Sequence, residues 1–193
     1  YEDKLGTYLV QIGRQNLSEQ DSRVVSELLH IVGDVERISD HSVGIAKSAE
    51  KIKEKNLKFS DKAEEEIQVM INAVEEILNK AKIAFQENNT DMALSVEAME
   101  HVIDHLKHEL KKRHIDRLKN GKCSIEQGFI MTDIITSLER ISDHCSNVAG
   151  CIEEIGHGSL GIHAYAKEIS KGPGSEFDKK YQEYQKRYEL ETS

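Results

Sequence analysis

The sequence predicts an all-α protein, and three observations carry that prediction. A single proline, no tryptophan and only 5% aromatic residues argue against a β-sandwich or a β-barrel. Long stretches rich in alanine, leucine, glutamate, lysine and isoleucine favour helices. The hexapeptide Glu36–His41 also recurs without change as Glu139–His144, 103 positions later (139 − 36 = 103). Such a duplication indicates a repeat architecture, and 193 residues can hold one ordinary domain or two small halves.

Capping residues and helix-breaking residues place the individual helices. Ser18 and Ser60 are typical N-cap residues, Thr90 and Asp91 begin a further helix, and Asn120-Gly121 is a typical helix end. The sequence Gly172-Pro173-Gly174 separates the last helix from the rest of the chain. The predicted helices cover, in order, residues 1–14, 18–55, 60–86, 90–120, 124–156 and 177–188, with a further short segment at 163–170.

The duplication extends beyond the hexapeptide and defines the domain organisation. Asp3-Lys4-Leu5 matches Asp104-His105-Leu106 at an offset of 101 (104 − 3 = 101), so the repeating unit is at least a helical hairpin. The helix at 60–86 completes a three-helix unit in the second copy. We therefore expect a helical domain at 1–158 with antiparallel three-helix repeats at about 1–57 and 58–158, followed by a linker and a C-terminal helix at 159–193.

The first repeat is expected to be truncated at its N-terminus. Tyr1 opens a helical sequence without a capping residue ahead of it, which indicates a fragment of a longer protein. Residues 1–14 should then pack less completely than their second-copy counterparts. A second chain, as in a homodimer, or the 177–188 helix should cover their apolar face. We expect burial for the apolar positions shared by the two copies: Ile31, Val35, Ile38, Ile45, Ile134, Leu138, Ile141 and Val148.

Charge and hydropathy exclude several classes of function. A net charge of −9 argues against a nucleic-acid partner, because binding to phosphates needs a basic surface. No run of 18 apolar residues is present, so these residues do not themselves span a membrane. The three cysteines lack the spacing of a zinc site and suit reduced thiols in a cytosol.

The repeated hexapeptide carries the first candidate site. Glu36 and Asp40, like Glu139 and Asp143, lie one helical turn apart, where like charges cost roughly 0.2–0.5 kcal/mol. Two carboxylates at this spacing can chelate or bridge a metal ion, which would compensate the repulsion. The alternative is an ordinary helix edge at which neighbouring arginines neutralise the acids.

The predicted helix at 90–120 carries a second candidate. Its face opposite the apolar stripe combines carboxylates and imidazoles at metal-ligand spacing, although a solvated polar face would look the same. That face comprises Glu97, Glu100, His101, Asp104 and His108.

Two Glu-x-x-His motifs raise the alternative of a di-iron carboxylate bundle. They are Glu27–His30 and Glu154–His157. The two motifs do not occupy equivalent positions in the repeat, which argues against that alternative. Glycine-rich phosphate loops and nucleophile elbows are absent from the sequence.

Four segments resemble known proteins. Leu138–Ala149 resembles the signature of the PhoU family, and Val35–Ala46 is its first-copy partner. Met99–Leu106 is similar to a Glu-x-x-Ile-Asp-x-Leu segment on the preceding helix of that family. The resemblance covers roughly residues 1–155. The tail Phe177–Leu190 is similar to the end of sodium/phosphate cotransporters that carry a PhoU-like domain after their membrane part.

The resemblance implies two three-helix bundles whose acidic motifs bind multinuclear clusters of iron or zinc. It also implies control of phosphate uptake rather than catalysis. Two departures affect the first copy: the glutamate expected before Asp3 is missing, and Gly44 stands where the second copy has Asn147. The metal ligands implied by the resemblance are Glu36, Asp40, Glu100, Asp104, Glu139 and Asp143.

The leading functional prediction is a metal-binding, non-catalytic regulatory domain of a sodium/phosphate cotransporter. Its partner would be the membrane part of the same polypeptide, and its location the cytoplasmic face of the cell membrane. The alternative is a free PhoU-type regulator that acts on an ATP-driven (ABC) phosphate transporter complex and its sensor kinase. A third hypothesis, from a different class, is a di-iron carboxylate oxidase built on the same bundle.

Overall fold

The computed structural model describes residues 1–157 and 172–191, and the described chain is almost entirely helical. No β-strand occurs among these residues, so the predicted all-α fold is confirmed. The predicted segment at 163–170 lies outside the described residues. The helices are α1 (Glu2–Gly13), α2 (Glu19–Glu54), α3 (Asp61–Glu87), α4 (Thr90–Lys119), α5 (Ile125–His157) and α7 (Glu176–Arg187).

Local capping explains the helix boundaries. The Ser18 hydroxyl accepts a hydrogen bond from the Asp21 amide at the start of α2. The Ser60 hydroxyl accepts one from the Ala63 amide at the start of α3. Helix α4 is capped by Asn89, whose side chain accepts from the Met92 amide, and not by the Thr90-Asp91 pair of the prediction. Asn89 takes this role because it directly precedes the first helical residue, Thr90, so that its side-chain oxygen reaches a free amide of the first turn.

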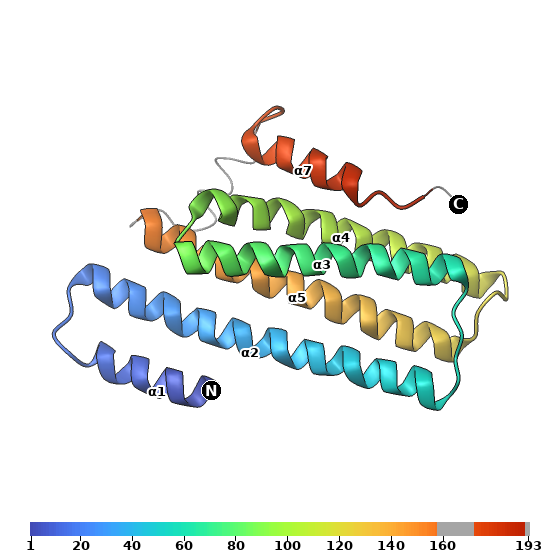
Figure 1. The fold of residues 1–193 in the computed structure, drawn as a ribbon, viewed down its shortest axis with the longest axis horizontal. Coiled ribbons are helices and arrows are strands. Elements are labelled where there is room, and N and C mark those ends of the chain that lie inside the picture. Colours follow the sequence, from blue (N-terminus) through green and yellow to red (C-terminus); the bar gives the residue numbers. More distant parts are fainter. Residues whose placement is uncertain (158–171, 192–193) are drawn as a thin grey trace.

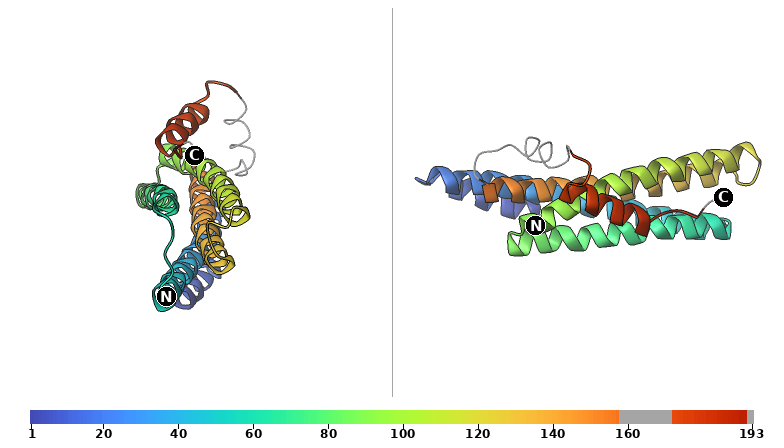
Figure 2. Two further views of the ribbon diagram at one scale, coloured as in Figure 1. Left: turned by 90° about the vertical axis from the view of Figure 1, so that its right-hand side faces the viewer. Right: turned by 90° about the horizontal axis from the view of Figure 1, so that it is seen from above.

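The helices form an elongated row, and α3 runs alongside two of its members. Figures 1 and 2 show the order α1, α2, α5, α4 and α7 across the molecule, with α3 against both α4 and α5. Helices α3, α4 and α5 thus form the three-helix unit expected for the second copy. Helix α1 packs against α2, and among the described helices none lies against this pair as α3 lies against α4 and α5.

An approximate two-fold relation joins the two copies where α2 and α5 run antiparallel (Figure 1). The rings of the equivalent residues His41 and His144 stack on each other with centroids 5.7 Å apart. Contacts away from this stack are reciprocal, as two-fold symmetry requires. Asn147 contacts Asp34, and the equivalent Gly44 lies against Ser137. Both hexapeptides are therefore in helices, and equivalent residues meet at the centre of the interface.

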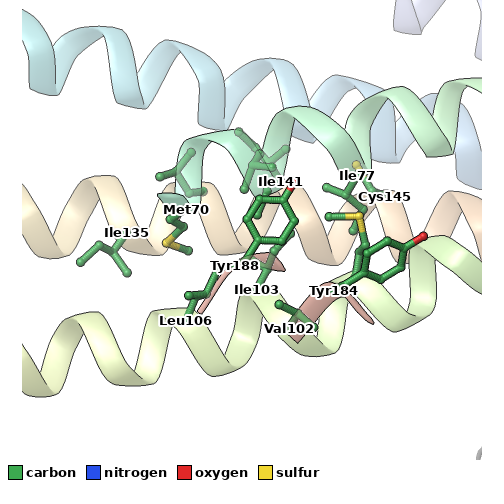
Figure 3. Close-up of a cluster of buried hydrophobic side chains, with 14 of the residues drawn as sticks. Met70, Ile77, Val102, Ile103, Leu106, Ile135, Ile141, Cys145, Tyr184 and Tyr188 are labelled. Atoms are coloured by element: carbon green, nitrogen blue, oxygen red, sulfur yellow. The ribbon is translucent and has the colours of Figure 1, made fainter. Parts of the chain in front are cut away.

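The main hydrophobic core belongs to the second copy. Met70, Ile77, Ile103 and Ile135 are almost completely inaccessible between α3, α4 and α5 (Figure 3). Of the apolar positions predicted to be buried, all four in the second copy are buried. In the first copy Ile31 is buried, and Ile38 and Ile45 are half-buried. The prediction is wrong for Val35, which is 55% exposed because no described helix covers that side of α2.

Helix α1 packs loosely, as predicted, and α7 does not cover it. Leu9 is the buried residue of α1, whereas Leu5, Tyr8 and Val10 are exposed. Helix α7 instead packs on α4, on the side of the molecule away from α1 (Figure 1), and Arg187 and Tyr188 at its end donate hydrogen bonds to Glu76 of α3. The reason is specific: the rings of Tyr184 and Tyr188 enter the second-copy core (Figure 3). The homodimer stays a prediction.

Candidate metal centre

The predicted carboxylates of the first copy form an exposed pair. Glu36 and Asp40 lie one turn apart on the solvent side of α2. The neighbouring charge of Asp40 raises the pKa of Glu36, and Glu2 at the start of α1 adds to the effect. Glu2 and Asp3 are themselves exposed. These acids are near one another, but solvent screens them.

The predicted carboxylates of the second copy are drawn into a less exposed environment between α4 and α5. Glu139 is buried, and Glu100, Asp104 and Asp143 are partly buried. Burial raises the pKa of Glu100 to about 7, and the charges of Glu97, Asp143, Asp104 and Glu139 add to the shift. Burial and the charge of Glu139 also raise the pKa of Asp143. The two antiparallel helices therefore bring all four predicted side chains into one electrostatic cluster, which we call the α4–α5 carboxylate cluster.

A lysine that sequence reasoning had not assigned to the site lies inside this cluster. The Lys107 ammonium donates to Glu139 Oε1 at 2.5 Å and to Asp104 Oδ1 at 3.2 Å. Burial would lower the pKa of Lys107, but the hydrogen bonds to Glu139 and Asp104 raise it, so the side chain carries a positive charge. Lys107 bridges a carboxylate of α4 to one of α5 and neutralises part of the cluster.

The remaining carboxylate oxygens are less well compensated. Arg140 Nη1 donates to Asp143 Oδ2 at 3.2 Å, as the arginine alternative had suggested. The same arginine's Nε lies 3.8 Å from Glu139 Oε2, which is buried and accepts no hydrogen bond. A buried carboxylate oxygen without a hydrogen bond is costly, so this atom is suited to a proton or a cation.

The donor set determines which ions the cluster could hold. Glu100, Glu139 and Asp143 offer oxygen donors, and oxygen-rich sites favour hard or borderline cations such as iron over zinc, which prefers nitrogen and sulfur. Among the described residues, no three histidine, cysteine, aspartate or glutamate side chains are arranged around one point as metal ligands. The acids fit a metal chemically, and their side chains would have to move to coordinate one.

The other polar residues of this face of α4 have separate partners. His101 Nε2 lies 3.9 Å from Glu100 Oε2, and the rings of His101 and Phe177 on α7 form a T-shaped pair. His108 contacts Asp104 and is exposed. Glu97 accepts a hydrogen bond from the Ser146 hydroxyl at 2.8 Å. The face is therefore partly solvated and partly joined to α5 and α7.

A second polar cluster between α2 and α5 was not predicted; Asp34 and His144 are buried there, and Asn147 lies at its exposed edge. His144 Nδ1 and Asn147 Nδ2 both donate to Asp34 Oδ1, at 2.8 and 3.0 Å. The residues equivalent to Asp34 and Asn147 are Ser137 and Gly44, so the copies differ here. The only sequence signal was that Asp34 interrupts an apolar stretch.

The structure brings together the glutamates of the two Glu-x-x-His motifs. Glu27 shares a hydrogen bond with Glu154, although they are not equivalent in the repeat. Burial raises the pKa of Glu27, the hydrogen bond from Cys151 opposes this rise, and Glu154 adds to it. The His157 side chain lies outside the described residues.

Comparison with known proteins decides the family. The model of the PhoU domain matches residues 1–49 and 67–152, which include both hexapeptides and the α4–α5 carboxylate cluster. The chain belongs to the PhoU family. A "Phosphate-specific transport system accessory protein PhoU homolog 1" from Thermotoga maritima is 28% identical over 137 residues, which are 71% of this chain and 58% of the relative. A PhoU homolog with the same kind of name, from Streptococcus pneumoniae, is 30% identical over 128 residues, 66% of this chain and 58% of the relative.

The crystal structure of PhoU from Pseudomonas aeruginosa shows the same fold. It matches with a TM-score of 0.76 at 24% identity and covers 82% of this chain and 75% of its own. The chain matches only about three-fifths of the length of the relatives from T. maritima and S. pneumoniae (58%).

The names of the relatives favour one of the functional hypotheses. They are named as accessory proteins of phosphate-specific transport systems, which fits a free PhoU-type protein better than the predicted domain of a sodium/phosphate cotransporter. None of the helices in the described part of the chain combines the length and apolar character that crossing a membrane requires.

Proposed function

We propose that this PhoU protein is a regulatory, non-catalytic accessory protein of a phosphate transport system, and that it acts at the cytoplasmic face of the membrane. The observation that supports this most directly is the family match, which covers both copies of the repeat. The relatives named as transport accessory proteins support the partner, a membrane-bound phosphate transporter complex. The α4–α5 carboxylate cluster contains acids and a lysine, which suit ion binding better than covalent catalysis.

We further propose that the α4–α5 carboxylate cluster binds iron or, less readily because zinc prefers nitrogen and sulfur donors, zinc. Glu100, Glu139 and Asp143 would hold the ion, with Asp104 at the edge of the site. Three properties support this: the raised pKa of Glu100, the Glu139 oxygen without a hydrogen bond, and an all-oxygen donor set. When bound, the metal would supply positive charge that joins α4 to α5. The exposed pair Glu36 and Asp40 on α2 would be a weaker site, because solvent already screens those charges.

Phosphate uptake in the source organism tests the regulatory role. A strain without the gene should take up radiolabelled phosphate faster than the wild type when phosphate is plentiful. The wild-type gene should restore control. Unchanged uptake in the deletion strain, together with failure of the protein to co-purify with the phosphate transporter from membranes, would contradict the proposal.

Thermal unfolding with and without metal tests the binding site. Added Fe²⁺ (without oxygen) or Zn²⁺ should raise the melting temperature, because a ligand that binds the folded state stabilises it. The double variant E139Q/D143N should lose that rise. The matched variant E36Q/D40N, which changes the equivalent acids of the first copy, should keep most of it.

A further inference from the structure

The α4–α5 carboxylate cluster contains a lysine, Lys107, that its first-copy counterpart lacks. Asp104 corresponds to Asp3 at an offset of 101, so Lys107 corresponds to Gly6 (107 − 101 = 6). The first copy therefore has no side chain at the place from which Lys107 enters the second. A β-carbon added at Gly6 would meet nothing within 4 Å, so packing does not require glycine there. The lysine is a feature of one copy only.

The ammonium of Lys107 makes the contacts that a bound cation would make. It lies between an oxygen of Asp104 on α4 and an oxygen of Glu139 on α5. Its side chain is 20% exposed and that of Glu139 is 8% exposed, so solvent screens this contact only partly. The ammonium occupies only one side of the cluster. Glu139 Oε2 still accepts no hydrogen bond, with Arg140 Nε 3.8 Å away, and the charge of Glu139 interacts with those of Glu100 and Asp143.

We propose that Lys107 is a tethered cation that occupies half of the α4–α5 carboxylate cluster, so that a divalent metal ion binds there only by displacing it. The proposal rests on the metal-binding part of the proposed function. Lys107 stabilises the metal-free cluster by neutralising Glu139. Its positive charge also opposes metal binding, because it would repel a cation held by the same carboxylates. It thereby sets the metal concentration at which the site fills, and exchange of ammonium for metal frees the lysine side chain at the surface of α4.

Titration with Mn²⁺, followed by electron paramagnetic resonance, tests this proposal on the full chain. Mn²⁺ is a suitable probe because it prefers oxygen donors and leaves most surface histidines alone. The variant K107Q should bind Mn²⁺ about tenfold more tightly than the wild type, or more, because one positive charge has been removed from the site. K107R keeps the charge and should bind like the wild type. K112Q, an exposed lysine of the same helix paired with Glu109, is the matched control and should change nothing.

The variants also make a prediction for the metal-free protein. With a chelator present, K107Q should melt about 5–10 °C below the wild type, because Glu139 is left buried without its partner. Mn²⁺ should shrink that difference. Equal Mn²⁺ affinity in K107Q and the wild type, with both binding, would overturn this inference alone. Absence of binding in both would overturn it together with the metal-binding part of the proposed function, while leaving the role in phosphate uptake to its own test.

A measurement on the wild-type chain does not depend on how the variants fold. Nitrogen NMR of the lysine ammonium groups should show Lys107 as a slowly exchanging, hydrogen-bonded signal in the metal-free protein. Diamagnetic Zn²⁺ should convert it to the fast-exchanging signal of a free lysine. A bound-metal state in which the Lys107 signal keeps its protected position would contradict displacement.

Discussion

The two copies of the repeat share a hexapeptide but use it in different surroundings. In the second copy, α4 buries side chains from Ala93 to His114 and the acids of α4 and α5 lie in partly buried positions. In the first copy, α1 buries Leu9, and Glu36 and Asp40 are exposed. The difference lies in the covering helix, because α3 packs on α4 and α5 and no described helix packs on α1 and α2 in that way. The same six residues therefore produce a screened surface pair in one copy and a strongly interacting cluster in the other.

The largest contrast should appear when equivalent core residues are truncated. Ile141 is 3% exposed inside the second-copy core, whereas its equivalent Ile38 is half-buried. Ile141→Ala should lower the free energy of unfolding by about 3–5 kcal/mol, and Ile38→Ala by about 1–2 kcal/mol. Urea unfolding followed by circular dichroism measures both. Equal losses would show that α2 is covered in solution as fully as α5.

Removal of equivalent carboxylates sharpens the comparison. Glu139→Gln leaves Lys107 without its strongest partner and should destabilise the metal-free protein by about 2–4 kcal/mol. The matched change Glu36→Gln should cause no loss, because it removes a like charge beside Asp40 at an exposed position. The measurement is urea unfolding at pH 7.5 with a chelator. If Glu139→Gln left the free energy of unfolding unchanged, the Lys107 contact would contribute nothing to stability.

The pH dependence of stability reports on Glu100. Its pKa is about 7 in the folded chain and near 4.5 when the group is unhindered, so the folded state holds the proton more tightly. Stability from this group is therefore lost as pH rises from about 4.5 to 7. Glu100→Gln should raise the free energy of unfolding by about 1–3 kcal/mol at pH 8, and the gain should vanish near pH 4.5. Glu109→Gln, on the same helix beside Lys112, serves as the control. A pH-independent gain would place Glu100 outside the cluster.

The smallest effect comes from giving the first copy the lysine that it lacks. Gly6→Ala should stabilise the protein by about 1 kcal/mol, because alanine favours a helix over glycine and the position is open. Gly6→Lys should add roughly 0.2–0.5 kcal/mol more through a pair with Asp3 three residues earlier. Thermal unfolding of the two variants isolates the contribution of charge. Equal stability of the two would show that the first-copy acids do not respond to an added cation.

Periodicity, capping and the duplicated motif predicted the helices well because those features are local. The long helices begin and end within a few residues of their predicted bounds. Helix burial was predicted less well, because it depends on neighbours. Val35 and Leu138 are equivalent in the repeat, yet only Leu138 is buried, since α3 covers one copy and not the other. The docking site of α7 could not be predicted either, because the sequence of an amphipathic helix does not indicate which surface it will pack against.

The candidate site was predicted in part. Residue spacing placed Glu100 and Asp104 on one helix face and Glu139 and Asp143 one turn apart on another helix. The resemblance to the PhoU family joined the four as one ligand set, and the structure does bring them into one cluster. Lys107 was missed because a lysine between acids on an exposed face usually faces water. Its contact with Glu139 depends on the register between α4 and α5, which local patterns do not encode. Asp34 was missed for a similar reason, since its partners lie on the other copy.

Metal content tests most directly whether the α4–α5 carboxylate cluster is a metal site. The protein should be purified without chelators or metal-affinity columns, incubated with Fe²⁺ or Zn²⁺, desalted and analysed by inductively coupled plasma mass spectrometry. We expect at least one metal ion per chain for the wild type and for E36Q/D40N, and background levels for E139Q/D143N. Equal metal content in the wild type and E139Q/D143N, or none in either, would show that these acids form an ion-pair network and not a metal centre.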